Sequence, residues 1–186
     1  MARKRIKLPL LEEDILELKA GDAVLLSGSL LSFRDAAHKR IVAALKNHES
    51  LPVQLAGETI YYMGPCPTPP GRVIGAAGPT TSGRMDNYTP TLLEAGIKGM
   101  IGKGQRSPEV IRSMMNYQAV YFAALGGAGA LIARAIKKAE VIAYPDLGPE
   151  AIHRLNVEDL PVIVAIDSKG NDLYETGRKQ YESILS

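Results

Sequence analysis

Residues 118–144, QAVYFAALGGAGALIARAIKKAEVIAY, predict a strand, a helix and a second strand in immediate succession. The apolar run QAVYFAAL ends at a glycine turn, GGAGALIARAIKKA continues as a helix, and EVIAY is rich in residues that favour strands. Units of this kind alternate strands with helices packed against a sheet. The stretch therefore favours an α/β fold.

The remainder of the chain alternates in the same way. Further strands are expected at 6–10, 23–28, 58–65, 97–104 and 161–167, and further helices at 12–19, 36–48, 89–96, 108–117 and 146–155. Ser32 stands where the N-cap of the 36–48 helix is expected, with Asp35 as the acid of a capping box. Because no repeat or linker interrupts the pattern, residues 1–186 are expected to form a single domain with a mixed, partly parallel sheet.

The composition argues against several classes of protein. Lys and Arg number 22 against 20 Asp and Glu, a net charge of +2, without the basic excess of a nucleic-acid-binding protein. The single cysteine, Cys66, leaves too few thiolates for a disulfide framework, a structural zinc or an iron–sulfur cluster, and indicates a reducing, cytoplasmic compartment. Residues 113–133 carry no charge, but their polar residues and glycines favour a strand, a turn and a helix over a membrane span.

Familiar catalytic motifs are missing from the sequence. It contains no Walker A motif, no HExxH and no Gly-x-Ser-x-Gly elbow, and its three histidines lack the spacing of metal ligands. The turn at 126–129 lies where a dinucleotide-binding turn would, but Ile132 replaces its third glycine or alanine. A tight turn is favoured, and its free amides leave a contact with an anion open.

A loop of about twenty residues follows the strand expected at 58–65 and ends in GPTTSGRMD, residues 78–86. A structureless loop of this length inside a compact domain is usually functional. From its residues alone, GPTTSGRMD allows a simple turn, a phosphate cradle or a reactive hydroxyl presented to an anionic substrate.

Three cations lie near the ends of expected loops or elements. Arg34 projects close to the apolar face of the 36–48 helix, where it either pairs with an acid such as Asp35 or meets a ligand carboxylate. Lys103 lies between two glycines, which either admit a ligand closely or leave a lysine in solvent. Arg84 follows Thr80 by four residues. Together the three suit a small dianion.

Five stretches resemble a known family in their order along the chain. SFRDAAHKRI, YYMGPCPTPPGRVIGAAGPTTSGRMD, KGMIGKGQRS, GGAGAL and YPDLGPEAI resemble the β subunit of class I fumarate hydratase and L-tartrate dehydratase. In single-chain class I fumarases the same unit is the C-terminal domain. The resemblance covers about residues 8–173 and implies a layered β/β/α domain similar to the swivelling domain of aconitase-like enzymes.

The resemblance also implies a function. It implies an oxygen-sensitive hydro-lyase that interconverts fumarate and (S)-malate, or the alternative reaction of L-tartrate dehydration. A separate α subunit would carry a 4Fe-4S cluster on its own three cysteines, as a heterodimer or α2β2 assembly with this chain. This chain would bind a small dicarboxylate and no metal, nucleic acid or membrane.

The resemblance finally implies roles for individual residues. Thr80 matches the proposed base, and Arg34, Thr81, Arg84 and Lys103 match or adjoin substrate contacts. A threonine hydroxyl is a poor base, so cations are expected beside it, Arg84 first among them. Residues expected to support the site are Asp35, His38, Asp86, Gly126 and Gly127, with Asp86 either paired with Arg84 or capping the following helix. Gln105 stands where relatives commonly have asparagine.

Overall fold

One seven-stranded sheet organises the chain, in the order β1-β2-β3-β4-β5-β7-β6. The computed structural model describes residues 3–124 and 127–185. The strands are β1 (Lys4–Lys7), β2 (Ala23–Ser32), β3 (Thr59–Tyr61), β4 (Gly99–Gly102), β5 (Val120–Ala123), β6 (Ile136–Ala143) and β7 (Ile152–Ile166). Strands β1 to β5 pair in parallel with their neighbours, and β7 is antiparallel to β2, β5 and β6. The α/β class with a mixed, partly parallel sheet is confirmed.

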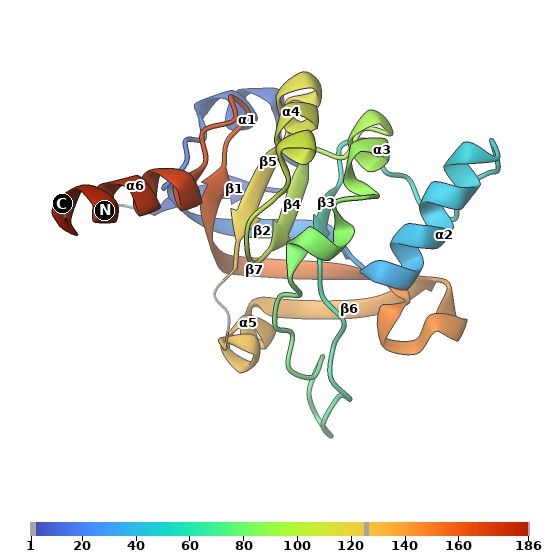
Figure 1. Ribbon diagram of the computed structural model, residues 1–186. Helices are drawn as coiled ribbons and strands as arrows, with labels where there is room; N and C mark the ends of the chain where they lie inside the picture. Colours follow the sequence, from blue (N-terminus) through green and yellow to red (C-terminus); the bar gives the residue numbers. More distant parts are fainter. Residues whose placement is uncertain (1–2, 125–126, 186) are drawn as a thin grey trace.

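Strand β7 is paired along both edges. One edge runs beside β2, from Ala23 opposite Ile163 to Ser32 opposite His153. The other edge pairs first with β6 and then with β5, where Ala123 again lies opposite Ile163. Strands β2, β3, β4, β5 and β7 therefore form a closed ring of pairings, and Figure 1 shows β7 running across beneath the parallel strands.

Helices lie on both sides of this sheet. They are α1 (Glu12–Glu17), α2 (Asp35–Lys46), α3 (Thr89–Glu94), α4 (Pro108–Tyr117), α5 (Gly129–Ala135) and α6 (Leu173–Leu185), with short 3-10 helices η1 (Ser82–Met85) and η2 (Pro145–Glu150). In Figure 1, α2, α3 and α4 lie on one side of β7 and α5 on the other. Among residues 3–124 and 127–185, no helix combines the length and apolar character needed to cross a membrane.

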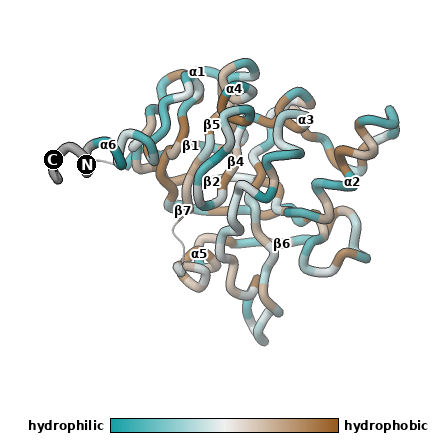
Figure 2. Tube along the Cα trace, viewed as in Figure 1, coloured by the Kyte–Doolittle hydropathy of each residue, from teal (hydrophilic) through white to brown (hydrophobic). Residues whose placement is uncertain are grey.

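The strands supply two apolar clusters by the alternation of their side chains. Tyr61, Ile101 and Phe122 belong to one cluster, whereas the preceding residues Ile60, Met100 and Tyr121 belong to the other. Successive side chains of a strand point to opposite faces, so each parallel strand is buried on both. Figure 2 shows the hydrophobic residues concentrated in the strands at the centre.

Two expected helices are wrong in part. The helix expected at 146–155 is the 3-10 helix η2, and β7 begins at Ile152. Gly148 at φ +55° and Pro149 interrupt helical geometry, after which Ile152, Leu155 and Val157 are buried along a strand. The helix expected at 126–139 is only α5, because from Ile136 onward the chain pairs with β7. Gly126, expected to support the site, lies outside the described residues.

The expected helix start at Ser32 is also wrong. Ser32 is the last residue of β2, and its hydroxyl donates a 3.2 Å hydrogen bond to the Met63 carbonyl. Helix α2 begins at Asp35, and Arg34 is its extended N-cap residue without a capping side-chain hydrogen bond. Ser32 belongs to β2 because the Ser32 backbone pairs with both β3 and β7.

We expect Gly102→Ala to destabilise the fold by about 1–3 kcal/mol, because overpacking a tight core displaces its neighbours. A Cβ at Gly102 would lie 2.0 Å from Ser82 Oγ and 3.0 Å from Tyr62 Cδ2. Urea unfolding followed by circular dichroism measures the change. The matched control is Gly177→Ala in α6, where a Cβ meets nothing within 4 Å. Equal midpoints for wild type and Gly102→Ala would contradict this packing.

Candidate functional site

The end of the long loop pairs with the end of β4. Thr80 N–H donates to the Tyr62 carbonyl at 2.7 Å, and Lys103 N–H donates to the Thr80 carbonyl at 3.3 Å. Ser82 N–H donates in turn to the Lys103 carbonyl at 2.8 Å, and Thr81 forms a parallel bridge with Lys103. Thr80 is half-buried, whereas Thr81 and Lys103 are exposed. The backbone therefore holds Thr80, Thr81 and Lys103 side by side at the carboxyl end of the parallel strands.

A buried hydroxyl chain supports this corner from within. Ser82 Oγ and Tyr121 Oη are 2.9 Å apart, and Tyr121 donates a 2.9 Å hydrogen bond to the Gly104 carbonyl. Since the tyrosine has one proton and the carbonyl only accepts, Ser82 is the donor to Tyr121. Burial raises the pKa of Tyr121, which keeps that proton in place. These hydroxyl groups thus link Gly104, the residue after Lys103, to Ser82, whose N–H binds the Lys103 carbonyl.

Arg84 ties the same loop to the start of α2. Its Nε donates to Asp35 Oδ1 at 3.0 Å, and Nη2 lies 2.9 Å from Asp35 Oδ2 without the alignment of a hydrogen bond. Asp86, expected either to pair with Arg84 or to cap α3, does neither. It pairs with Arg106 Nε at 2.7 Å and accepts a 2.6 Å hydrogen bond from Ser107 N–H. Arg84 thus pairs with Asp35, 49 positions earlier in the sequence, and not with Asp86, two positions later.

Arg34 lies at the amino end of α2, next to the residue that holds Arg84. Its Nε is 3.0 Å from Glu150 Oε1, so the expected local pairing with Asp35 is replaced by an acid from η2. The sequence reasoning did not assign Glu150, although it lies within the motif YPDLGPEAI. Asp35 thus places Arg84 beside the α2 terminus, and Glu150 places Arg34 there.

His38 is fully buried beneath Arg34. Its Nδ1 lies 3.0 Å from the Arg34 carbonyl, which accepts the proton, and Nε2 has no hydrogen-bond partner among the described residues. Phe33, Tyr62 and Tyr88 surround the ring at centroid distances of 4.5, 5.3 and 6.0 Å. Burial lowers the pKa of His38 to about 4, so the ring is neutral near pH 7. A neutral His38 holds the Arg34 backbone and supplies no charge.

Arg106 is a second side chain that the sequence reasoning did not assign. It is buried against Asp86, donates from Nη2 to Thr89 Oγ1 at 2.7 Å, and lies over the Tyr62 and Tyr121 rings. A buried arginine needs such partners, and here they anchor the segment after Lys103. The signal that could have identified Arg106 is its position in KGMIGKGQRS, between two elements that are buried.

The glycine turn before α5 adjoins the loop just ahead of Thr80. Ala77 N–H donates to the Gly129 carbonyl at 3.1 Å, and a Cβ at Gly129 would lie 3.1 Å from Gly78 N. Gly127 is exposed at φ +79°, with nothing within 4 Å of an added Cβ. The turn therefore packs on the loop through Gly129.

The described residues do not fit an iron–sulfur cluster. Within residues 3–124 and 127–185, no group of three or more His, Cys, Asp or Glu side chains is placed to hold a metal ion. Cys66 is exposed in the long loop. A 4Fe-4S cluster needs several thiolates, so its ligands would have to come from elsewhere.

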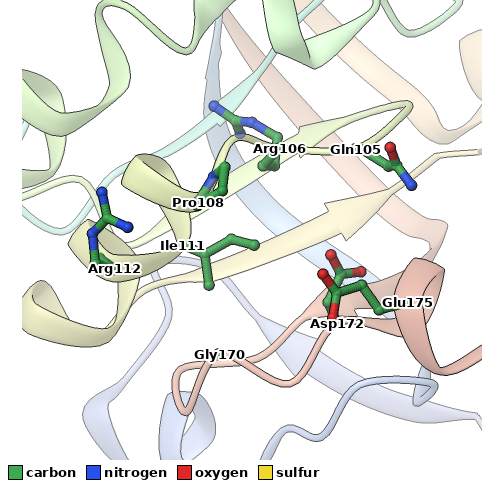
Figure 3. A pocket seen from close by; sticks show the side chains of 8 residues that line it. All are labelled: Gln105, Arg106, Pro108, Ile111, Arg112, Gly170, Asp172 and Glu175. Carbon is green, nitrogen blue, oxygen red and sulfur yellow. The ribbon is translucent and has the colours of Figure 1, made fainter.

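Two cavities lie close to the supporting residues but are not lined by the hydroxyl and the three cations. One, of about 420 Å³, lies between the start of α4 and the segment joining β7 to α6, and Figure 3 shows Asp172 and Glu175 across it from Arg106. The other, of about 610 Å³, lies between loop residues 69–76 and α5. Neither is lined by Thr80, Arg34, Arg84 or Lys103. The candidate site is the corner where Thr80, Thr81 and Lys103 lie side by side, together with the start of α2, where Arg84 and Arg34 are each paired with an acid.

We expect acid to destabilise the protein through His38. The unfolded chain takes up this proton near pH 6.5, whereas the folded chain resists it down to about pH 4. The contribution of neutral His38 to the free energy of unfolding is therefore fully present above pH 6.5. It falls by about 3 kcal/mol as the pH drops toward 4. Urea unfolding at pH 7, 6, 5 and 4.5 measures it.

His38→Phe is the comparison variant for this prediction. It loses the hydrogen bond to Arg34 at every pH, but it should lose less additional stability between pH 7 and 4.5 than wild type. A smaller slope remains because burial also lowers the pKa of His153. Equal slopes for wild type and His38→Phe would show that His38 is not the group responsible.

Comparison with known proteins places the chain in a family. Residues 2–177 match the family model described as Fumarase C-terminus. Fumarate hydratase 2 of Leishmania major is 37% identical over 164 residues, covering 87% of this chain and 29% of that protein. The aerobic class I fumarate hydratase of Escherichia coli K12 is 40% identical over 152 residues, covering 81% of this chain and 28% of that protein. The chain thus spans less than a third of these relatives.

A third relative is similar in length. The putative L(+)-tartrate dehydratase subunit beta of Methanocaldococcus jannaschii is 38% identical over 182 residues, covering 94% of this chain and 93% of that subunit. These matches confirm the resemblance drawn from the motifs.

Proposed function

This chain belongs to the fumarase C-terminal family, and from that premise we propose that it is the β subunit of a two-subunit hydro-lyase that hydrates fumarate to (S)-malate. One observation carries the proposal: backbone pairing holds Thr80 beside Lys103, and Arg84 is joined through Asp35 to the helix end that bears Arg34. A hydroxyl and three cations held by connected elements would suit a dicarboxylate.

The partner is proposed from what this chain lacks. The described residues offer no ligand set for a cluster, and the M. jannaschii relative is named as a subunit beta. We propose that a cluster-bearing α subunit completes the site as a heterodimer or α2β2 assembly, and that its 4Fe-4S group supplies Lewis-acid chemistry when bound. Residues 1–186 would then act as one domain in the cytoplasm, closing over the substrate.

The three cations would bind and orient the substrate. Arg34 and Arg84 present guanidinium groups to carboxylate oxygens, and Lys103 adds a compact charge next to Thr80. Removing a proton beside a carboxylate increases the negative charge on that carboxylate. Each contact is therefore stronger in the transition state than in the bound substrate, which is the condition for catalysis. Thr81 lies beside them as a further polar contact.

Thr80 would accept the proton. Its hydroxyl needs a nearby positive charge to act as a base near neutral pH. Arg84 shares its charge with Asp35, whereas Lys103 is exposed and adjoins Thr80 through the backbone. We therefore propose Lys103, ahead of Arg84, as the cation that supports Thr80.

We expect Thr80→Ala to lower kcat by about a hundredfold or more, the usual contribution of general acid–base catalysis. The measurement is fumarate absorbance under anaerobic conditions, with the chain reconstituted with its α subunit. Thr68→Ala is the matched control, since Thr68 is exposed in the same long loop. Near-wild-type turnover of Thr80→Ala would assign this chain a structural role, and iron-free activity of the isolated chain would overturn the two-subunit proposal.

L-Tartrate dehydration is the second candidate, favoured by the relative that matches over nearly its whole length. Fumarate hydration would give malate, and tartrate carries one additional hydroxyl. Parallel assays of the reconstituted enzyme with malate and L-tartrate distinguish the two. A higher kcat/KM for malate supports fumarate hydratase, and a higher value for tartrate transfers the proposal to the second reaction.

A further inference from the structure

Helix α2 receives its N-terminal cap from a distant carboxylate. Arg34, the N-cap residue, makes no capping side-chain hydrogen bond, but Glu150 Oε2 accepts a 2.9 Å hydrogen bond from Ala36 N–H. Glu150 ends η2, 114 residues further along the chain. A negative charge is stabilised there by the free N–H groups and the dipole of the 12-residue helix.

The other oxygen of the same carboxylate faces Arg34. Glu150 Oε1 lies 3.0 Å from Arg34 Nε, and that nitrogen is buried without an aligned hydrogen bond. The space around it is tight, because a Cβ at Gly64 would lie 3.0 Å from Arg34 Nε and 2.9 Å from the Pro149 carbonyl. One carboxylate thus caps the helix and neutralises the inner edge of the guanidinium.

Arg34 is held at both ends. At its backbone, the carbonyl accepts 3.0 Å hydrogen bonds from His38 N–H and from His38 Nδ1. At its side chain, Glu150 pairs with the inner nitrogen Nε, and no residue within 3–124 or 127–185 occupies the terminal nitrogens, so they can meet a ligand. An arginine fixed in this way loses little freedom when it binds a carboxylate.

We infer that Glu150 is a positioning residue for Arg34: its carboxylate sets the direction in which the guanidinium meets the substrate. This inference rests on the proposed function, which makes Arg34 a substrate contact. The competing account is a simple tie between η2 and α2. Such a tie exists nearby, since Arg40 Nη1 donates to Asp146 Oδ1 at 2.9 Å between the same two elements, with both side chains largely exposed.

Glu150→Gln separates the two tasks of the carboxylate. A glutamine oxygen still accepts from Ala36 N–H, but its NH₂ group then faces Arg34 and the charge is lost. Asp146→Asn is the matched control, because it removes an α2–η2 ion pair without touching Arg34. Both variants are measured with the α subunit for kcat and KM, and by urea unfolding.

We expect Glu150→Gln to lower kcat about tenfold with KM within about threefold, since a misdirected contact costs most in the transition state. Asp146→Asn should keep both constants close to wild type. Unchanged kinetics for Glu150→Gln, or an equal loss of kcat in both variants, would overturn the inference and leave Glu150 as a structural tie.

A second measurement does not depend on activity. In the full ¹⁵N-labelled chain, the Arg34 Nε–H signal, assigned with Arg34→Lys, should exchange with water at least tenfold faster in Glu150→Gln than in wild type, because loss of the ion pair releases the buried nitrogen to solvent. Equal exchange rates would overturn the inference. If the wild-type complex turned over neither substrate, the proposed function would fail, while this exchange comparison would still decide whether Glu150 fixes Arg34.

Discussion

Hydrogen bonding along both edges of β7 is the constraint on which the remaining structure depends. Strand β2 occupies one edge, and β6 and β5 share the other, so the parallel strands are enclosed in a ring of pairings. Enclosure fixes the carboxyl ends of β3 and β4, and the loop that returns through Thr80 pairs with the end of β4. A site at the carboxyl ends of parallel strands is the usual outcome of this geometry.

The candidate site places positive charge on a surface of a nearly neutral chain. Arg34 and Arg84 are each paired with a carboxylate. The pairing compensates their positive charge in the folded protein when no ligand is bound. Lys103 instead relies on its backbone, held by Thr80, Ser82 and the hydroxyl of Tyr121 through Gly104. The three cations are therefore held by different means: two by acids on other elements and one by the sheet itself.

The sequence predicted what depends on local pattern and missed what depends on distant partners. The α/β class and the strands around 58–65, 97–104 and 118–125 follow from apolar and β-branched runs, and parallel pairing follows from their alternation with helices. Residues 146–155 were mistaken for a helix because short apolar runs are ambiguous until a pairing strand is known. Thr80, Arg84 and Lys103 were named through a motif, but no local rule could pair Arg84 with Asp35 or Arg34 with Glu150.

The ring also governs the order in which the chain can fold. Residues 23–32 of β2 pair in part with β1 and β3, but their long antiparallel pairing is with residues 153–163, so the ring cannot close until most of the chain has been synthesised. Until then, the outer edges of β2 and β5 expose unpaired backbone groups, the usual template for association with other chains. Pairing with β7 covers both edges, so the last long strand closes the ring and removes these exposed backbone groups.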